Sequence, residues 1–69
     1  MEEYALNDYL SAKKSLISTR NKIQQVIITL EEKQASGRNL KAQITLSRER
    51  VKALNLSLAL IEREISRLS

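Results

Sequence analysis

Two stretches of this chain repeat apolar residues at alternating steps of three and four, and the only glycine, Gly37, lies between them. Such spacing lines up a stripe along one side of an α-helix and is typical of a coiled-coil seam. The stripe before the glycine comprises Ala5, Tyr9, Ala12, Leu16, Thr19, Ile23, Val26 and Leu30. The stripe after it comprises Leu40, Ile44, Ser47, Val51, Leu54, Leu58, Ile61, Ile65 and Leu68. We therefore expect an all-α fold, a two-helix antiparallel coiled-coil hairpin in which these stripes form the seam.

The turn between the two helices is predicted at 36–38. Glycine readily takes the left-handed conformation that ends a helix, and Asn39 is a suitable N-cap for the helix that follows. No proline occurs in the chain, so nothing else interrupts the helical pattern. We predict a single domain over residues 1–69, with helix one at about 4–35 and helix two at about 39–68. The short connection makes the helices antiparallel neighbours.

The sequence leaves the start of helix one open. Asn7 and Asp8 are residue types that cap helices, so this helix could instead begin at Tyr9. Residues 1–6 would then form an arm outside the hairpin.

A second group of apolar residues lies off the seam when each residue is turned by about 100° around its helix axis. In helix two, three of them recur at seven-residue steps and a fourth lies beside them. In helix one, they lie nearly opposite the seam. An apolar stripe left in water usually marks an interaction site. We expect these residues to bind a partner: Leu46, Ala53, Leu56 and Leu60 in helix two, and Leu10, Ile17 and Ile28 in helix one.

The chain is too short to build a strong core of its own. Domains below about 70–80 residues usually need disulfides, a metal or association for their stability. With 69 residues, no cysteine and no histidine, the chain has no disulfide and lacks the commonest metal and haem ligands. It also lacks the commonest general base and thiol nucleophile. We therefore expect no cofactor, no metal and no enzymatic activity, and association with a partner's helices or with a second copy.

Charge is distributed unevenly along the chain. Residues 1–37 carry five basic and five acidic residues, whereas residues 38–69 carry seven basic and three acidic ones and hold the whole net charge of +4. Contact with nucleic acid or another anion is suggested by Arg38, Lys41, Arg48, Arg50 and Lys52. They spread around helix two, however, and no aromatic residue accompanies them for base stacking. A solvated helix surface is the simpler interpretation, and we do not expect nucleic-acid binding.

The sequence predicts neither a membrane span nor a signal peptide. No apolar run approaches the roughly 20 residues that span a bilayer. The first residues, Met1-Glu2-Glu3, are acidic where a signal peptide would be basic. We expect a cytoplasmic protein that does not associate with membranes.

The segment Arg48-Glu49-Arg50-Val51-Lys52-Ala53-Leu54, with the apolar stretch that continues through Ile61, resembles helix two of the YscE family in type III secretion systems. The resemblance covers about residues 22–65 and includes the position of the glycine turn. It implies a cytosolic, non-catalytic co-chaperone that pairs with a larger helical-repeat chaperone and helps to keep the needle subunit unpolymerised. Two alternatives remain open: a homo-oligomeric coiled-coil scaffold or filament subunit, and a small basic nucleic-acid-binding regulator.

Overall fold

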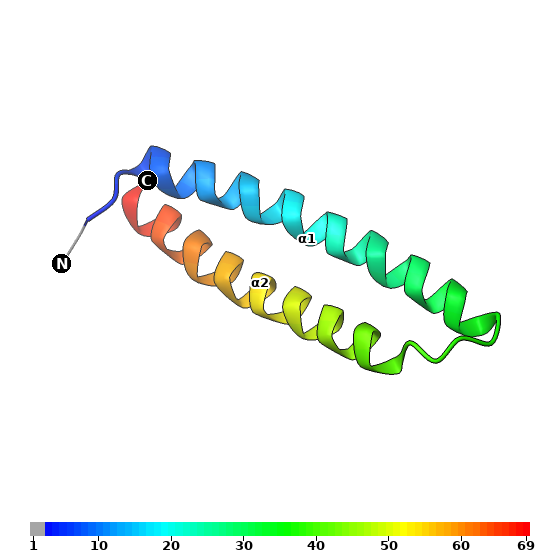
Figure 1. Ribbon diagram of the computed structural model, residues 1–69. Helices are drawn as coiled ribbons and strands as arrows, with labels where there is room; N and C mark the ends of the chain where they lie inside the picture. Colours follow the sequence, from blue (N-terminus) through cyan, green and yellow to red (C-terminus); the bar gives the residue numbers. More distant parts are fainter. Residues whose placement is uncertain (1–2) are drawn as a thin grey trace.

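The chain folds back on itself into two antiparallel α-helices that lie side by side (Figure 1). The computed structural model describes residues 3–69. Helix α1 spans Leu6–Ala35 and helix α2 spans Lys41–Leu68. The start of α1 and the end of α2 meet at one end of the rod and the turn lies at the other. The molecule measures 49 × 18 × 17 Å. The all-α hairpin predicted from the apolar spacing is therefore confirmed.

Helix α1 begins at Leu6, two residues later than predicted and three residues before the alternative start at Tyr9. The backbone N–H of Ala5, its N-cap, donates to Asp8 Oδ2 at 3.0 Å. Asp8 thus lies inside the first turn, where its negative charge also interacts favourably with the helix dipole. The Tyr4 and Tyr9 rings meet edge to face with their centroids 6.3 Å apart, which covers this end of the seam.

The turn has the hydrogen-bond pattern of a Schellman motif. Gly37 has φ of +108°, its N–H donates to the Gln34 carbonyl at 3.0 Å, and the Arg38 N–H donates to the Lys33 carbonyl at 3.4 Å. Only glycine takes such a positive φ without strain. The glycine therefore ends the helix as predicted.

Helix α2 begins two residues later than predicted, and Asn39 is not its N-cap. Leu40 holds that position, because its carbonyl accepts the first helical hydrogen bond from the Ile44 N–H at 3.0 Å. The Leu40 side chain cannot cap the helix, but it is half-buried at the end of the seam. The Leu40 N–H is satisfied instead by Gln34 Oε1 at 3.3 Å. Asn39 Oδ1 still accepts a hydrogen bond from the Lys41 N–H at 3.5 Å, one residue ahead of the N-cap position.

The seam of α2 lies where the sequence predicted it. Ile44 and Leu58 are each 5% exposed, and Ser47 between them is also buried. The other predicted seam residues of α2 are half-buried, except Leu68 at the end of the helix, which is exposed.

The seam of α1 differs from the prediction at three positions. Five predicted members are half-buried, namely Tyr9, Ala12, Leu16, Ile23 and Leu30, whereas Ala5, Thr19 and Val26 are exposed. A second half-buried line runs one residue later at the alternate steps, through Leu6, Lys13, Arg20 and Ile27. The physical reason is size. The long aliphatic stems of Lys13 and Arg20 cover more of α2 than alanine or threonine can, while their charged ends reach polar partners at the edge.

Over the residues that the structure describes, neither helix has a stretch long and apolar enough to cross a bilayer.

Candidate interaction surfaces

One edge of the hairpin is crossed by polar contacts, and we call it the polar edge. Arg48 Nη2 and Glu31 Oε2 lie 2.7 Å apart near the turn. Arg20 Nη1 donates to Asn55 Oδ1 at 3.2 Å in the middle. Lys13 Nζ and Glu62 Oε1 lie 3.6 Å apart towards the chain ends. Within residues 3–69, every side-chain hydrogen bond or ion pair between α1 and α2 lies on this edge. These contacts all belong to one register of the two helices and are distributed along their length.

Arg20 is a seam residue that the sequence pattern did not reveal. Its side chain is half-buried, and its Nε atom is buried without a hydrogen-bond partner in the described structure. An unsatisfied buried donor costs roughly 1–3 kcal/mol. A polar residue at a seam position usually weakens a coiled coil but fixes its register. The signal that could have identified it is the line of large residues that begins at Leu6 and ends at Ile27.

The opposite edge of the hairpin, which we call the open edge, is lined by smaller side chains. Rotation by about 100° per residue places Ala12, Thr19 and Val26 of α1 on it, with Ser57 of α2 facing them. Val26 is a large apolar residue left exposed there, which the predicted seam had enclosed. Polar contacts therefore join the two helices along one edge, while the side chains along the other edge are accessible to solvent.

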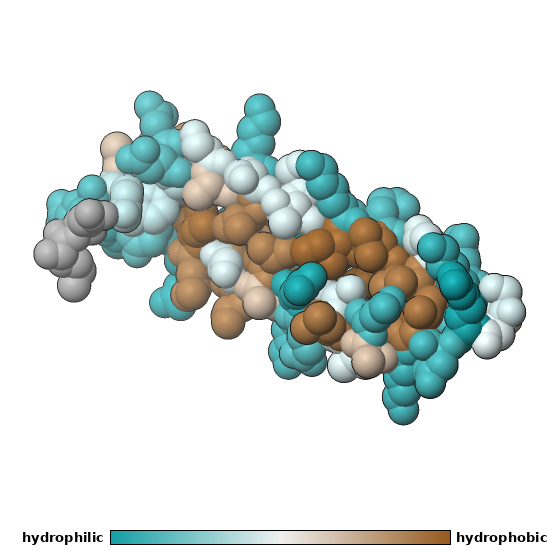
Figure 2. Space-filling view, viewed as in Figure 1, coloured by the Kyte–Doolittle hydropathy of each residue, from teal (hydrophilic) through white to brown (hydrophobic). Residues whose placement is uncertain are grey.

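The predicted partner-binding residues of α2 form one surface. Leu46, Ala53 and Leu60 lie on a single line about 130° round from the direction that faces α1, on the side of the open edge, and Leu56 lies beside them. All four are exposed, and the three leucines keep 52–64% of their accessible surface. We call this surface the α2 outer face. On the side drawn in Figure 2, hydrophobic side chains run along the junction of the helices and extend over α2.

The predicted partner-binding residues of α1 lie elsewhere. Leu10 and Ile17 share a line along the polar edge, where Leu10 is exposed and Ile17 is half-buried. Ile28 is exposed and lies further round the same side of α1. The structure therefore does not bring the seven predicted residues into one surface. It separates them into the α2 outer face and a smaller, discontinuous group on the other side of the hairpin.

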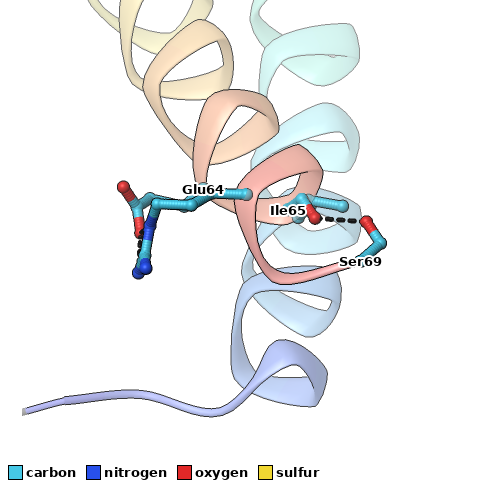
Figure 3. Close-up of polar contacts among 4 residues, drawn as sticks. Glu64, Ile65 and Ser69 are labelled. Atoms are coloured by element: carbon cyan, nitrogen blue, oxygen red, sulfur yellow. Dashed lines mark hydrogen bonds and ion pairs between the residues drawn. The ribbon is translucent and has the colours of Figure 1, made fainter.

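Glu64 and Arg67 form an ion pair near the end of α2. Glu64 Oε2 accepts hydrogen bonds from Arg67 Nη2 at 2.7 Å and Arg67 Nε at 3.0 Å. These bonds lower the pKa of the Glu64 carboxyl below its ordinary value, and the nearby charge of Arg63 lowers that pKa further. Figure 3 shows the Glu64 carboxylate in this pair on one side of α2, and the bond from the Ser69 hydroxyl to the Ile65 carbonyl on the other side. The pair leaves the charge of Arg67 compensated within α2.

Other cations of α2 are not held in an ion pair. In the part of the chain that the structure describes, Arg50, Lys52 and Arg63 form no salt bridge. Arg48, by contrast, is paired with Glu31, so the basic run that suggested nucleic-acid binding is partly neutralised. Residues 3–69 contain no cluster of three or more metal-ligating side chains.

Comparisons with protein-family models, with curated proteins and with solved structures found no match to this chain.

Proposed function

We propose that this chain is a small non-catalytic co-chaperone that completes its fold on the helices of another protein. In the specific form suggested by its resemblance to the YscE family, it binds a larger helical-repeat chaperone in the cytosol. Together they help to keep a type III secretion needle subunit unpolymerised. The segment Arg48–Leu54 carries that resemblance, and physical features of the hairpin support the need for a partner.

The observation that carries this proposal is the accessible surface that the hairpin leaves in water, which includes large hydrophobic side chains of both helices. Only Ile44 and Leu58 are buried among the apolar residues of the described chain. The accessible surface is 5559 Å², whereas a compact monomer of 7.9 kDa exposes about 4,400 Å². The excess of about 1,100 Å² is similar to the roughly 800 Å² that each partner buries in a stable complex. A partner that covers the α2 outer face would remove much of this excess.

Co-expression tests the proposal directly. The chain is produced with the helical-repeat chaperone and needle subunit encoded in its own genome, and the complex is examined by size-exclusion chromatography. We expect co-elution and a higher melting temperature than that of the isolated chain, because binding to the folded state stabilises it. Failure to co-elute, together with a stable homodimer whose mass does not vary with concentration, would contradict the proposal.

A homo-oligomeric scaffold is the second candidate. The observation that favours it is that Leu10 and Ile28 are exposed on the side away from the α2 outer face. Each copy thus offers apolar residues on two sides, which is what head-to-tail assembly requires. Sedimentation of the isolated chain distinguishes the two candidates, because the scaffold predicts a mass that rises with concentration.

A further inference from the structure

We infer that the α2 outer face takes an amphipathic helix from another protein, and that carboxylates border the apolar stripe of that helix. This inference rests on the proposed function and adds the chemistry of the partner. It follows from the shape of the face, from the charges around it and from the accessible surface left by the hairpin.

The shape of the face fits a single helix. Leu46 and Leu60 are fourteen residues apart, which corresponds to about 21 Å along α2. The small side chain of Ala53 lies halfway between these two large ones. A large side chain from an approaching helix can therefore pack over Ala53, as a knob packs into a hole. The occupant therefore needs about four helical turns with a continuous apolar stripe.

The charges around the face favour an acidic occupant. Arg50 borders the face on the side of the open edge, Lys52 borders it on the opposite side, and Arg63 lies beyond Leu60. None of these three cations forms a salt bridge within the described residues. Glu49 is the one carboxylate between Leu46 and Leu60 on this surface. Carboxylates on both flanks of a docked helix would therefore meet cations that are not held in salt bridges.

The same charges disfavour a second copy as the occupant. Residues 38–69 hold the whole net charge of +4. A symmetric dimer through the α2 outer face would bring two such segments together, and like charges across an interface oppose association. A flat anionic membrane suits the cations, but Glu49 interrupts the apolar surface that would have to enter it. A separate acidic helix meets both the apolar and the charged features.

Two synthetic helical peptides of about 21 residues test the inference. Both carry leucine at the seam positions of three heptads; one carries glutamate at the flanking positions and its twin carries lysine. Binding to the full chain is measured by fluorescence anisotropy of labelled peptide at low and high salt. We expect the glutamate peptide to bind about tenfold more tightly than the lysine peptide, with the preference reduced by salt.

Four variants localise the binding. Leu60→Glu and, separately, Leu46→Glu are expected to weaken the glutamate peptide about tenfold or more, with helicity unchanged in circular dichroism. The matched control is Leu10→Glu, an exposed leucine on the other side of the hairpin, which should bind as the parent chain does. The double variant Arg50→Glu/Arg63→Glu should reverse the preference between the peptides.

Several outcomes would overturn the inference. These are equal binding of both peptides, no binding of either, or unchanged binding in both leucine variants. A homodimer of the parent chain that Leu60→Glu dissociates would assign the face to a second copy. Binding to vesicles of phosphatidylcholine and phosphatidylserine without peptide binding would assign it to a membrane. A chaperone complex that still co-purifies with the Arg50→Glu/Arg63→Glu variant would contradict only this inference. The absence of any complex with the parent chain would contradict the proposed function.

Discussion

Arg20 of α1 donates from Nη1 to Asn55 Oδ1 of α2 at 3.2 Å, while the Nε atom of the same guanidinium is buried without a partner. The contact therefore satisfies only part of the hydrogen-bonding capacity of the guanidinium. It joins the two helices at mid-length, but it places a partly unsatisfied charge where a coiled coil usually holds an aliphatic residue. Such a residue lowers stability and at the same time excludes other alignments of the helices.

Replacement of this arginine should stabilise the isolated hairpin. In Arg20→Leu an apolar side chain fills the seam and the unsatisfied donor is lost, so we expect a gain of about 1–3 kcal/mol in the free energy of unfolding. Urea unfolding, monitored by circular dichroism, measures this change in the free energy of unfolding. Asn55→Ala serves as the control, because it removes the acceptor and leaves the charge in place, and it should destabilise. A less stable Arg20→Leu variant would show that the contacts of Arg20 stabilise the hairpin by more than its unsatisfied donor destabilises it.

Two leucines of α2, one in the core and one on the surface, should differ in their effect on stability. Leu58 is buried and Leu60 is exposed. Leu58→Ala should cost about 2–4 kcal/mol, which is a large share of what so small a domain has. Leu60→Ala should change the stability of the isolated chain by no more than about 0.5 kcal/mol. Thermal unfolding of both variants checks the difference. Similar losses in the two would mean that the α2 outer face belongs to the core.

The turn should depend on Gly37 through its backbone conformation alone. Its φ is +108°, and no atom lies within 4 Å of the place that a Cβ would take. Gly37→Ala should therefore cost about 1–2 kcal/mol from backbone strain, with the helix content kept. Gly37→Asn should cost less, since asparagine tolerates left-handed conformations better. Equal stability of the alanine variant and the parent chain would contradict the strain argument.

The ion pair at the end of α2 predicts a measurable pH dependence. Arg67→Gln should raise the pKa of Glu64 towards the ordinary glutamate value of about 4.3, because the hydrogen bonds that lower it are lost. A lowered pKa in the folded state means that the pair contributes to stability at neutral pH. That contribution disappears as the pH falls through the pKa of Glu64. NMR titration of the side-chain carboxyl measures the shift, and Arg63→Gln should give a smaller one.

Much of the fold could be predicted from the sequence because local signals agreed with one another. The apolar spacing of residues 40–68 and the glycine at position 37 each specify the geometry that is found. The register of α1 could not be predicted in the same way. In the sequence, the line through Ala12 and Thr19 is more apolar than the line through Lys13 and Arg20. The structure shows why the second line also packs against α2, because Asn55 and Glu62 provide polar partners for Arg20 and Lys13.

The candidate site was predictable on α2 and less so on α1. Leu46, Ala53 and Leu60 share one line on any straight helix, so their grouping depends on α2 alone. Whether Leu10 and Ile28 join them depends on which side of α1 faces α2, and that follows from the seam register. A shift of one residue at alternate seam positions was therefore enough to leave the exposed Val26 unrecognised.

The Schellman turn at Gly37 also bears on how the hairpin forms. Residues that pair near the turn, such as Glu31 and Arg48, are close in sequence, whereas Lys13 and Glu62 meet only after a long loop has closed. Loop closure costs more entropy as the loop lengthens. The helices should therefore pair first near the turn and last at the chain ends, and the hairpin should open in the reverse order. Backbone amides beside Ile44 should accordingly exchange with solvent later than those beside Ile65.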